Sequence, residues 1–239
     1  MIQFYAPDIE TDPRLPEAES LHCARVLRMK EGERLVATDG KGRRYDCVIL
    51  SAHPKHVELE VTDVREIAPH WGAPVELIVA PTKNSERMEW LIEKAVEIGV
   101  DRITLISSRH SERRRINTDR LRKIMVSAMN QSLKTTLPEL RGPIPIGEVL
   151  AESADGAGFI AYCADDVPRT SFAARCPAAG PVRILIGPEG DFSPEEAAEA
   201  LARGFVPVTF GQSRLRTETA ALFALQTVHI VRQQADAGN

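Results

Sequence analysis

From Pro74 onward the sequence alternates short apolar runs with helical patterns, and this alternation constrains the fold more than any other feature. The apolar runs have strand length and lie at 75–80, 102–106, 159–163, 182–186 and 206–210. Helical patterns at 86–98, 119–133, 194–203 and 218–234 stand between or after them. Near-continuous apolar strands that alternate with helices indicate a mostly parallel sheet covered on both faces. The sequence therefore predicts an α/β domain over 74–239.

The first 70 residues follow a different pattern. A helical pattern at 17–29 precedes β-rich runs at 34–38, 45–50 and 57–61, and the tetrapeptide Asp39-Gly40-Lys41-Gly42 joins the first two runs as a hairpin turn would. Residues 66–73 resemble a linker. We therefore expect a small β-barrel or sheet domain over 1–70, ahead of the α/β domain.

The composition is that of a globular chain, with 43% hydrophobic and 27% charged residues among 239. No apolar run approaches the roughly 18 residues of a membrane span, and the N-terminus lacks the pattern of a signal peptide. The four cysteines lie far apart and the six histidines show no metal-binding spacing. We therefore expect a cytoplasmic protein with no membrane anchor, disulfide framework or bound metal.

The charge is unevenly distributed, although the net charge is only −4. The segment 22–44 holds seven basic and three acidic residues, and 109–123 holds seven basic and two acidic ones. Two basic segments on an acidic chain suggest a directed contact with a polyanion. A solvated loop is the alternative for the run at 113–115. The candidate RNA contacts are Arg25, Arg28, Arg43, Arg44, Arg113 and Arg114.

The loop after the run at 182–186 carries the first chemical motif, Gly187-Pro188-Glu189-Gly190. Ser193, Pro194 and Glu196 follow it and predict a capping box at the start of the next helix. A well-made strand–turn–helix connection would explain the caps, but one turn rarely needs both glycines. Because ligands bind beyond the carboxyl ends of parallel strands, the loop is a candidate binding site.

The second motif follows the run at 206–210 and also opens a helix. It contains Gly211, the arginines Arg214 and Arg216, and Thr217 as the expected N-cap. Arginines beside a glycine turn can hold a carboxylate or phosphate in bidentate fashion. Exposed arginines beside a helix cap are the plainer alternative. We expect both loops to converge on one crevice and to bind a ligand mainly through backbone groups.

At these two loops the sequence resembles the 16S rRNA (uracil-N3)-methyltransferase family of the SPOUT superfamily. The segments 186–190 (Ile-Gly-Pro-Glu-Gly) and 215–220 (Leu-Arg-Thr-Glu-Thr-Ala) match closely, and weaker matches lie at His22, 26–28, 32–33, Lys83 and 93–100. Two departures stand out. Asp191 occupies a position where the family often has a third glycine, and Asn130-Gln131-Ser132-Leu133-Lys134 replaces the usual Glu-Gln-Ser-Gly-Arg.

The resemblance implies a PUA-like β-barrel that helps to hold RNA, followed by an α/β domain tied in a deep trefoil knot. It also implies a homodimer that uses S-adenosylmethionine to convert a uracil of 16S ribosomal RNA to 3-methyluridine. The cofactor-binding residues it implies are Ile186, Gly187, Pro188, Glu189, Gly190, Gly211, Leu215, Arg216, Thr217 and Ala220.

The N3 atom of uracil is a poor nucleophile while it is protonated, so a transferase must help to remove that proton. Glu218 is the nearest candidate base on the motif, and Arg216 is the candidate that stabilises charge on the uracil oxygens. Two other functions remain open: methylation at another ribosomal or transfer RNA site, and an inactive RNA-binding module. The intact loops argue against the inactive module.

Overall fold

The computed structural model describes residues 2–112, 116–153, 155–163 and 167–237. The chain forms two compact units, one made of Met1–His70 with Met125–Leu137 and one made of Trp71–Ile124 with Pro138–Asn239. The sequence divides the chain at 1–70 and 74–239. The structure also groups 125–137 with the first unit, because the end of a helix from the α/β region packs there.

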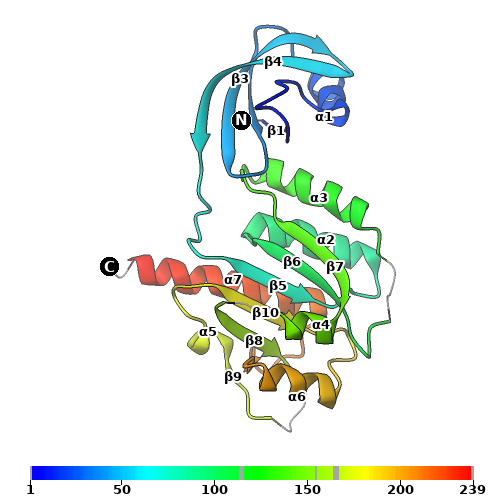
Figure 1. Cartoon of the computed structure of the whole chain (residues 1–239), viewed down its shortest axis with the longest axis vertical. Helices are drawn as coiled ribbons and strands as arrows, with labels where there is room; N and C mark the ends of the chain where they lie inside the picture. The colour runs from blue at the N-terminus through cyan, green and yellow to red at the C-terminus, as the bar shows by residue number, and fades with distance from the viewer. Residues whose placement is uncertain (1, 113–115, 154, 164–166, 238–239) are drawn as a thin grey trace. The chain divides into compact units, whose positions relative to one another are not determined.

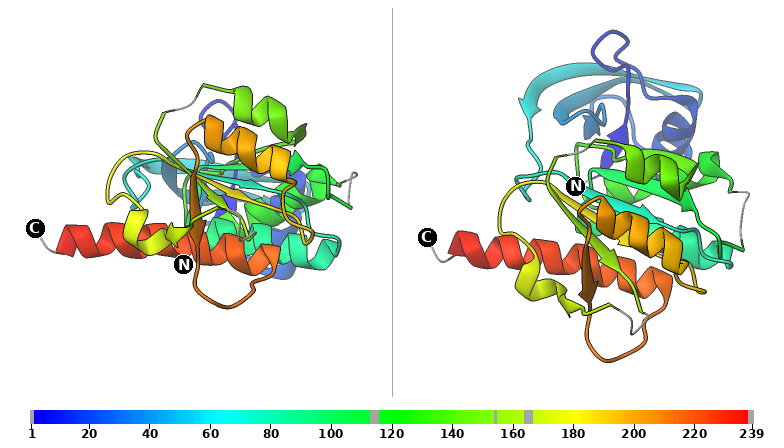
Figure 2. Two further views of the ribbon diagram at one scale, coloured as in Figure 1. Left: turned by 90° about the horizontal axis from the view of Figure 1, so that it is seen from below. Right: turned by 60° about the horizontal axis from the view of Figure 1, so that its bottom comes forward.

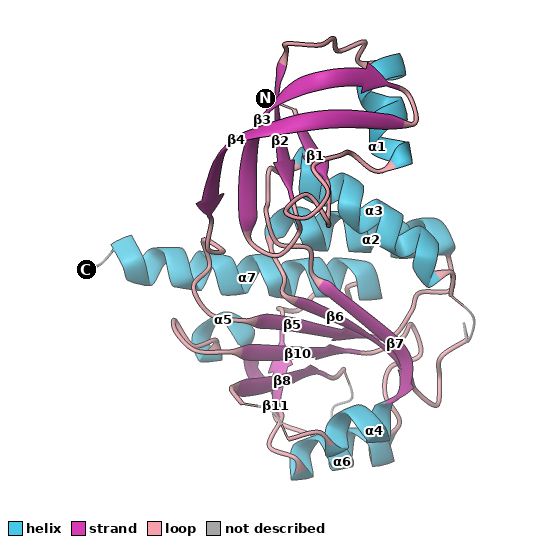
Figure 3. Cartoon of the chain, turned by 45° about the horizontal axis from the view of Figure 1, so that its top comes forward, coloured by secondary structure: helices cyan, strands magenta, loops and turns pink. Residues whose placement is uncertain are grey.

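The first unit is built on a four-stranded sheet in the order β1 (Gln3–Tyr5), β2 (Arg34–Thr38), β3 (Arg43–His53) and β4 (His56–Glu66). The strands β1 and β2 are parallel, and the other neighbours are antiparallel. Figure 3 shows the long strands β3 and β4 beside the short helix α1 (Glu17–Leu21). The predicted hairpin is confirmed, whereas the predicted helix over 17–29 changes at residue 22 into a π-helical turn, η1 (His22–Val26).

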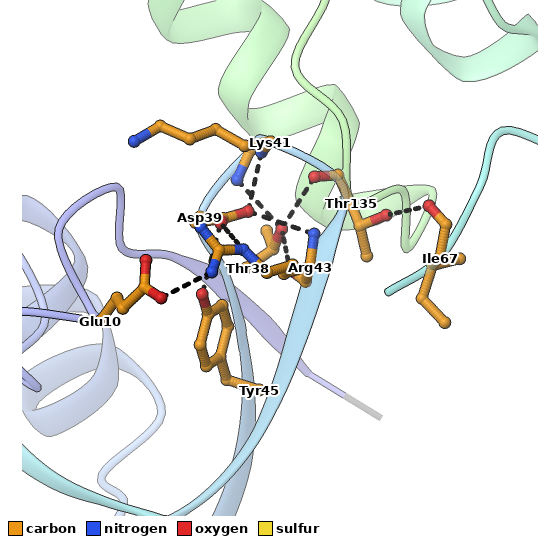
Figure 4. Close-up of polar contacts among 9 residues, drawn as sticks. Glu10, Thr38, Asp39, Lys41, Arg43, Tyr45, Ile67 and Thr135 are labelled. Atoms are coloured by element: carbon orange, nitrogen blue, oxygen red, sulfur yellow. Dashed lines mark hydrogen bonds and ion pairs between the residues drawn. The ribbon is translucent and has the colours of Figure 1, made fainter. Parts of the chain in front are cut away.

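The hairpin turn between β2 and β3 is organised by a buried aspartate (Figure 4). The Asp39 carboxylate accepts hydrogen bonds from the Lys41 backbone N–H at 2.8 Å and from Arg43 Nε at 2.9 Å. Thr38 Oγ1 lies 3.0 Å from the Thr135 carbonyl oxygen. The Leu137 N–H donates to the Gly40 carbonyl at 2.8 Å. The last two bonds, at Thr135 and Leu137, join the segment 125–137 to the hairpin of the first unit.

The second unit contains a seven-stranded sheet in which all paired strands are parallel. The strand order is β7 (Glu139–Pro145), β6 (Arg102–Ser107), β5 (Val75–Val79), β10 (Val182–Ile186), β8 (Ala157–Ala161), β11 (Val206–Thr209) and β9 (Thr170–Ser171). The predicted parallel sheet is confirmed. Strand β10 lies between β5 and β8, so the chain returns late to the centre of its own sheet (Figure 1).

Helices cover both faces of this sheet (Figure 2). One face carries α2 (Ser85–Ile98), α5 (Phe172–Arg175) and α7 (Thr217–Ala237), and the other carries α4 (Ile146–Ala151) and α6 (Pro194–Ala202). The helix α3 spans Thr118–Gln131. The predicted capping box of α6 is present, and Gly99, the glycine expected at the end of α2, is the C-cap that follows Ile98, with φ 127°. None of the helices in the described ranges combines the length and apolar character that a membrane crossing requires.

Candidate functional site

The loop at 187–193 leaves the carboxyl end of the central strand β10 and leads into α6. Its first two residues, Gly187 and Pro188, are buried, whereas Glu189 and Gly190 are exposed. A turn closes within it, because the Asp191 N–H donates to the Pro188 carbonyl at 2.9 Å. The Gly-Pro-Glu-Gly motif therefore lies at the carboxyl edge of the sheet, where parallel α/β folds bind ligands.

Four neighbouring segments are bonded to this loop. After β5, the Lys83 N–H donates to Glu189 Oε1 at 3.0 Å. After β6, His110 Nδ1 lies 3.1 Å from the Gly190 carbonyl oxygen. The other two bonds, at Cys163 and Thr217, involve the segments that follow β8 and β11. The loop is thus the common partner of these four segments at the carboxyl edge, and both predicted motifs meet there.

The two glycines of the motif are explained by close packing and not by an unusual backbone angle. A Cβ atom on Gly187 would lie 3.1 Å from the Phe192 ring, and one on Gly190 would lie 3.1 Å from the Cβ of His110. The left-handed conformation of this turn belongs to Asp191, with φ 62°. Each glycine therefore lets a different neighbour approach the loop, which accounts for the presence of both.

The second motif joins the loop through Thr217. The prediction that Thr217 is an N-cap is wrong, because α7 begins at this residue and its hydroxyl donates to the Gly187 carbonyl at 3.0 Å. Gly211 adopts a φ of 118°, which favours glycine. Of the other candidates, Leu215 and Ala220 are half-buried, and Arg216 is exposed and forms no ion pair with the residues that the structure describes.

Glu218 has a partner that the sequence did not indicate. Its side chain is 8% exposed, and Oε1 lies 3.5 Å from Nη1 of Arg87 on α2. The carboxylate therefore joins α2 to the first turn of α7, where the helix dipole also favours negative charge. Arg216 and Glu218, the two candidate catalytic residues, are close in sequence but differ in environment: one is exposed and the other is covered and paired.

The candidate RNA-binding residues fall into two groups. Arg25 and Arg28 are exposed on η1 and the turn after it. Arg43 is bonded to Asp39 and Glu10, and Arg44 is paired with Asp46 at 2.8 Å. Arg113 and Arg114 lie outside the described residues.

The described part of the chain contains no cluster of three or more His, Cys, Asp or Glu side chains that could hold a metal ion.

Comparison with known protein families agrees with this division of the chain. Residues 70–229 match the model of an RNA methyltransferase domain, and residues 15–62 match that of an RNA methyltransferase PUA domain. The first match covers more than half of the chain.

Relatives match nearly the whole length. The chain is 32% identical over 229 residues to ribosomal RNA small subunit methyltransferase E of Mycobacterium tuberculosis, an alignment that covers 92% of this chain and 86% of the relative. A crystal structure of a probable rRNA methyltransferase from Porphyromonas gingivalis is 47% identical, with a TM-score of 0.93 over 98% of this chain and 100% of the other. A ribosomal RNA small subunit methyltransferase E from Neisseria gonorrhoeae, crystallised with S-adenosylmethionine, is 25% identical, with a TM-score of 0.82 over 97% and 98%.

Proposed function

The chain belongs to the RNA methyltransferase family that includes ribosomal RNA small subunit methyltransferase E, and on this premise we propose that it methylates N3 of a uracil in the RNA of the small ribosomal subunit, with S-adenosylmethionine as methyl donor. The observation that carries the proposal is the convergence of the two motif loops, joined by the bond from Thr217 to Gly187, at the carboxyl edge of a parallel sheet. The homologue that was crystallised with S-adenosylmethionine supports the same cofactor.

The groups at this edge suit S-adenosylmethionine, which carries an adenine, a ribose, a sulfonium cation and an amino acid group. The loops offer backbone N–H and C=O groups for the adenine and ribose, and Leu215 offers an apolar surface. The exposed Glu189 brings negative charge toward a cation, whereas the charge of Glu218 is already paired with Arg87. We assign the cofactor to the ten residues that the motifs implied: Ile186, Gly187, Pro188, Glu189, Gly190, Gly211, Leu215, Arg216, Thr217 and Ala220. When bound, the cofactor supplies the methyl group.

The remaining chemistry falls to the chain's own side chains. The N3 proton of uracil must leave, and the negative charge that develops on the ring spreads to its carbonyl oxygens. The exposed guanidinium of Arg216 can donate hydrogen bonds to those oxygens. Glu218 is the candidate acceptor for the proton, and its pair with Arg87 engages only Oε1, which leaves Oε2 as the oxygen assigned to accept it. We therefore assign charge stabilisation to Arg216 and proton acceptance to Glu218.

RNA contacts are proposed for the exposed arginines Arg25 and Arg28 of the first unit. A groove of about 740 Å³ lies in the same unit, but its lining includes Asp46 and Asp63, which are paired with Arg65, so the groove itself carries mixed charge. Exposed cations such as Arg25 and Arg28 are suited to contacts with a phosphate backbone. Arg43 and Arg44 contribute less to this proposal, because carboxylates already neutralise them.

The assembly is proposed to be a homodimer, as the family resemblance implies. Helix α7 exposes Phe223 and Ile230, seven residues apart on one face, at 46% and 43% of their surface. Helix α2, which packs beside α7, exposes Trp90 at 47%. These large apolar side chains, exposed on adjacent helices, support the proposal of a surface that a second copy covers. The trefoil knot stays a prediction of the resemblance, and a ribosomal substrate would place the protein in the cytoplasm.

The activity can be tested with small-subunit RNA from a strain that lacks this modification. The purified chain is incubated with the RNA, or with the assembled subunit, and methyl-labelled cofactor, and the nucleosides are separated by mass spectrometry. We expect label in 3-methyluridine. Label in another nucleoside or only in transfer RNA would assign a different substrate, and binding of cofactor without transfer would favour an RNA-binding module.

A further inference from the structure

Asp191 lies in the loop at 187–193 but belongs to neither motif. Its φ of 62° is a conformation that glycine adopts freely and that costs other residues on the order of 1 kcal/mol, although aspartate tolerates it better than most. A glycine would be easier to accommodate here, and glycine is the residue that the resembled family often has. The side chain must therefore provide something that offsets the backbone cost.

Both carboxylate oxygens of Asp191 accept backbone hydrogen bonds. Oδ1 accepts from the Phe192 N–H at 2.8 Å, and Oδ2 accepts from the Cys163 N–H at 2.8 Å. The second bond crosses 28 positions and joins the loop after β10 to the segment after β8. Hydrogen bonds to a carboxylate are about twice as strong as neutral ones. Because both oxygens are used in this way, Asp191 is suited to holding the backbone and not to proton transfer.

The charges around Cys163 include one from the second motif. Partial burial of the thiol raises its pKa, the Asp191 charge raises it further, and the positive charges of Arg169 and Arg214 lower it. Arg214 belongs to the loop after β11, so its charge acts on this thiol together with that of Asp191.

We propose that Asp191 is a positioning residue: its carboxylate holds the backbone at Cys163, so that the segment after β8 lines the cofactor site together with the two motif loops. The proposal rests on the proposed function, since it assigns a role within that same site. It accounts for an aspartate at a left-handed position: its carboxylate is hydrogen-bonded to the segment after β8, whereas a glycine would offer no such bond. It requires that loss of the carboxylate weakens cofactor binding without unfolding the chain.

A matched set of variants separates the effect of losing the Asp191 hydrogen bonds from the effect of relieving its left-handed φ. Asp191→Gly removes both hydrogen bonds and relieves the backbone, while Asp191→Asn keeps one acceptor oxygen and tolerates the same φ. Leu133→Gly is the control, because Leu133 is also non-glycine at a left-handed φ, 56°, but lies in the first unit and has an apolar side chain. By calorimetry with the full chain, we expect the Kd for S-adenosylmethionine to rise about tenfold in Asp191→Gly, equivalent to about 1.4 kcal/mol. It should stay within about threefold of wild type in Asp191→Asn and in Leu133→Gly.

A second readout uses the thiol itself, since Cys163 is exposed and Cys23, Cys47 and Cys176 are buried. Asp191→Gly should react faster than wild type with a thiol reagent even without cofactor, and Asp191→Asn should react more slowly than Asp191→Gly. If wild type binds no S-adenosylmethionine, the proposed function fails. The rates at which Cys163 reacts with the thiol reagent in the absence of cofactor still test whether Asp191 holds the backbone at Cys163. An unchanged Kd in Asp191→Gly, or equal losses of affinity in the Gly and Asn variants, would overturn the role assigned to Asp191.

Discussion

Thr217 is bonded to Gly187 across 30 positions of sequence: its hydroxyl, at the first residue of α7, donates to the carbonyl that follows the central strand. Both residues are buried. The bond holds the start of the last helix against the loop that the neighbouring segments share. It links the two motifs directly.

Thr217→Val should therefore weaken cofactor binding, because it removes the donor and keeps the shape. The Gly187 carbonyl would then lack its side-chain partner, which costs about 1–3 kcal/mol for a buried group. We expect a rise of about tenfold or more in the Kd for S-adenosylmethionine, measured by calorimetry. Thr217→Ser keeps the hydroxyl and should bind nearly as wild type does. Equal affinity in the Val and Ser variants would contradict the role of this bond.

Arg216→Ala should lower kcat by about 100-fold, the typical effect of losing a donor that stabilises developing charge. Its effect on cofactor affinity should be far smaller, because the exposed guanidinium is assigned mainly to the uracil. Single-turnover methylation of small-subunit RNA, together with cofactor calorimetry, separates the two. A loss confined to cofactor affinity would move Arg216 from the chemical step to cofactor binding.

Glu218→Gln tests whether Glu218 accepts the uracil proton or only anchors α7 to α2 through its pair with Arg87. As the proton acceptor, Glu218 is needed in ionised form, so Glu218→Gln should lower kcat about 100-fold while the thermal midpoint changes little. Arg87→Met, which removes the partner 3.5 Å away, should keep kcat within a few fold of wild type. Similar losses of thermal stability and activity in both variants would instead make the pair an anchor between α2 and α7.

Neutralising Arg25 and Arg28 should weaken RNA binding and reduce its salt dependence, by about one unit of slope for each phosphate that the protein no longer neutralises. Arg25→Gln and Arg28→Asn are suitable, since asparagine tolerates the left-handed φ of 56° at residue 28. Filter binding across a salt series measures both quantities. Arg43→Gln serves as the contrast: it should lower the thermal midpoint, because Arg43 holds the buried Asp39. An unchanged salt slope in the double variant would move the RNA to another surface.

Phe223→Arg with Ile230→Arg should convert a dimer to a monomer, because charged side chains would then occupy the apolar face of α7. Analytical ultracentrifugation at micromolar concentration reports the mass directly. Glu199→Arg, a charge reversal at an exposed position of α6, should leave the mass unchanged. A wild-type chain that sediments as a monomer would remove the premise.

Glu19 should make the stability of the chain depend on pH. Burial raises the pKa of this carboxyl to about 7 from its ordinary 4.5, against the opposing bonds from the Tyr5 backbone and Asn130. A group with a raised folded pKa stabilises the fold below its unfolded pKa, and this contribution is lost as the pH rises from about 4.5 to about 7. Glu19→Gln should therefore match wild type near pH 4 and exceed its thermal midpoint at pH 8. Glu17→Gln, at an exposed position of the same helix, is the control and should show no such divergence.

The sequence allowed the parallel sheet to be predicted because its buried strands are short, apolar and separated by capped helices. It did not indicate β7, whose segment Glu139–Pro145 mixes a glycine and two prolines with charged residues and so lacks an apolar run. The membership of 125–137 in the first unit was also not predictable, because it depends on contacts such as that between Thr38 and Thr135, 97 positions apart.

At the candidate site, the two motif loops and the capping box were visible as local patterns. The misassigned cap shows the limit of such patterns: Thr217 is a common N-cap residue, but a carbonyl 30 positions away takes its hydroxyl instead. The bond from Cys163 to Asp191 gave only an indirect signal, an aspartate where the family often has glycine. Its partner could be found only in three dimensions.

The late return of the chain to the centre of the sheet has a consequence for biosynthesis. Val75 of β5 pairs with Val182 of β10, more than a hundred positions later, and β10 also pairs with β8. At typical rates of translation, β5 waits about 5–20 s for its neighbour. During that interval the buried, apolar strand β5 has an unpaired edge, and β8 has one as well once it has been made. Unpaired edges are templates for association between chains. Ribosomes that stall before residue 182 should therefore release fragments that aggregate, and efficient production of the protein should depend on uninterrupted translation of this interval or on chaperones that cover it.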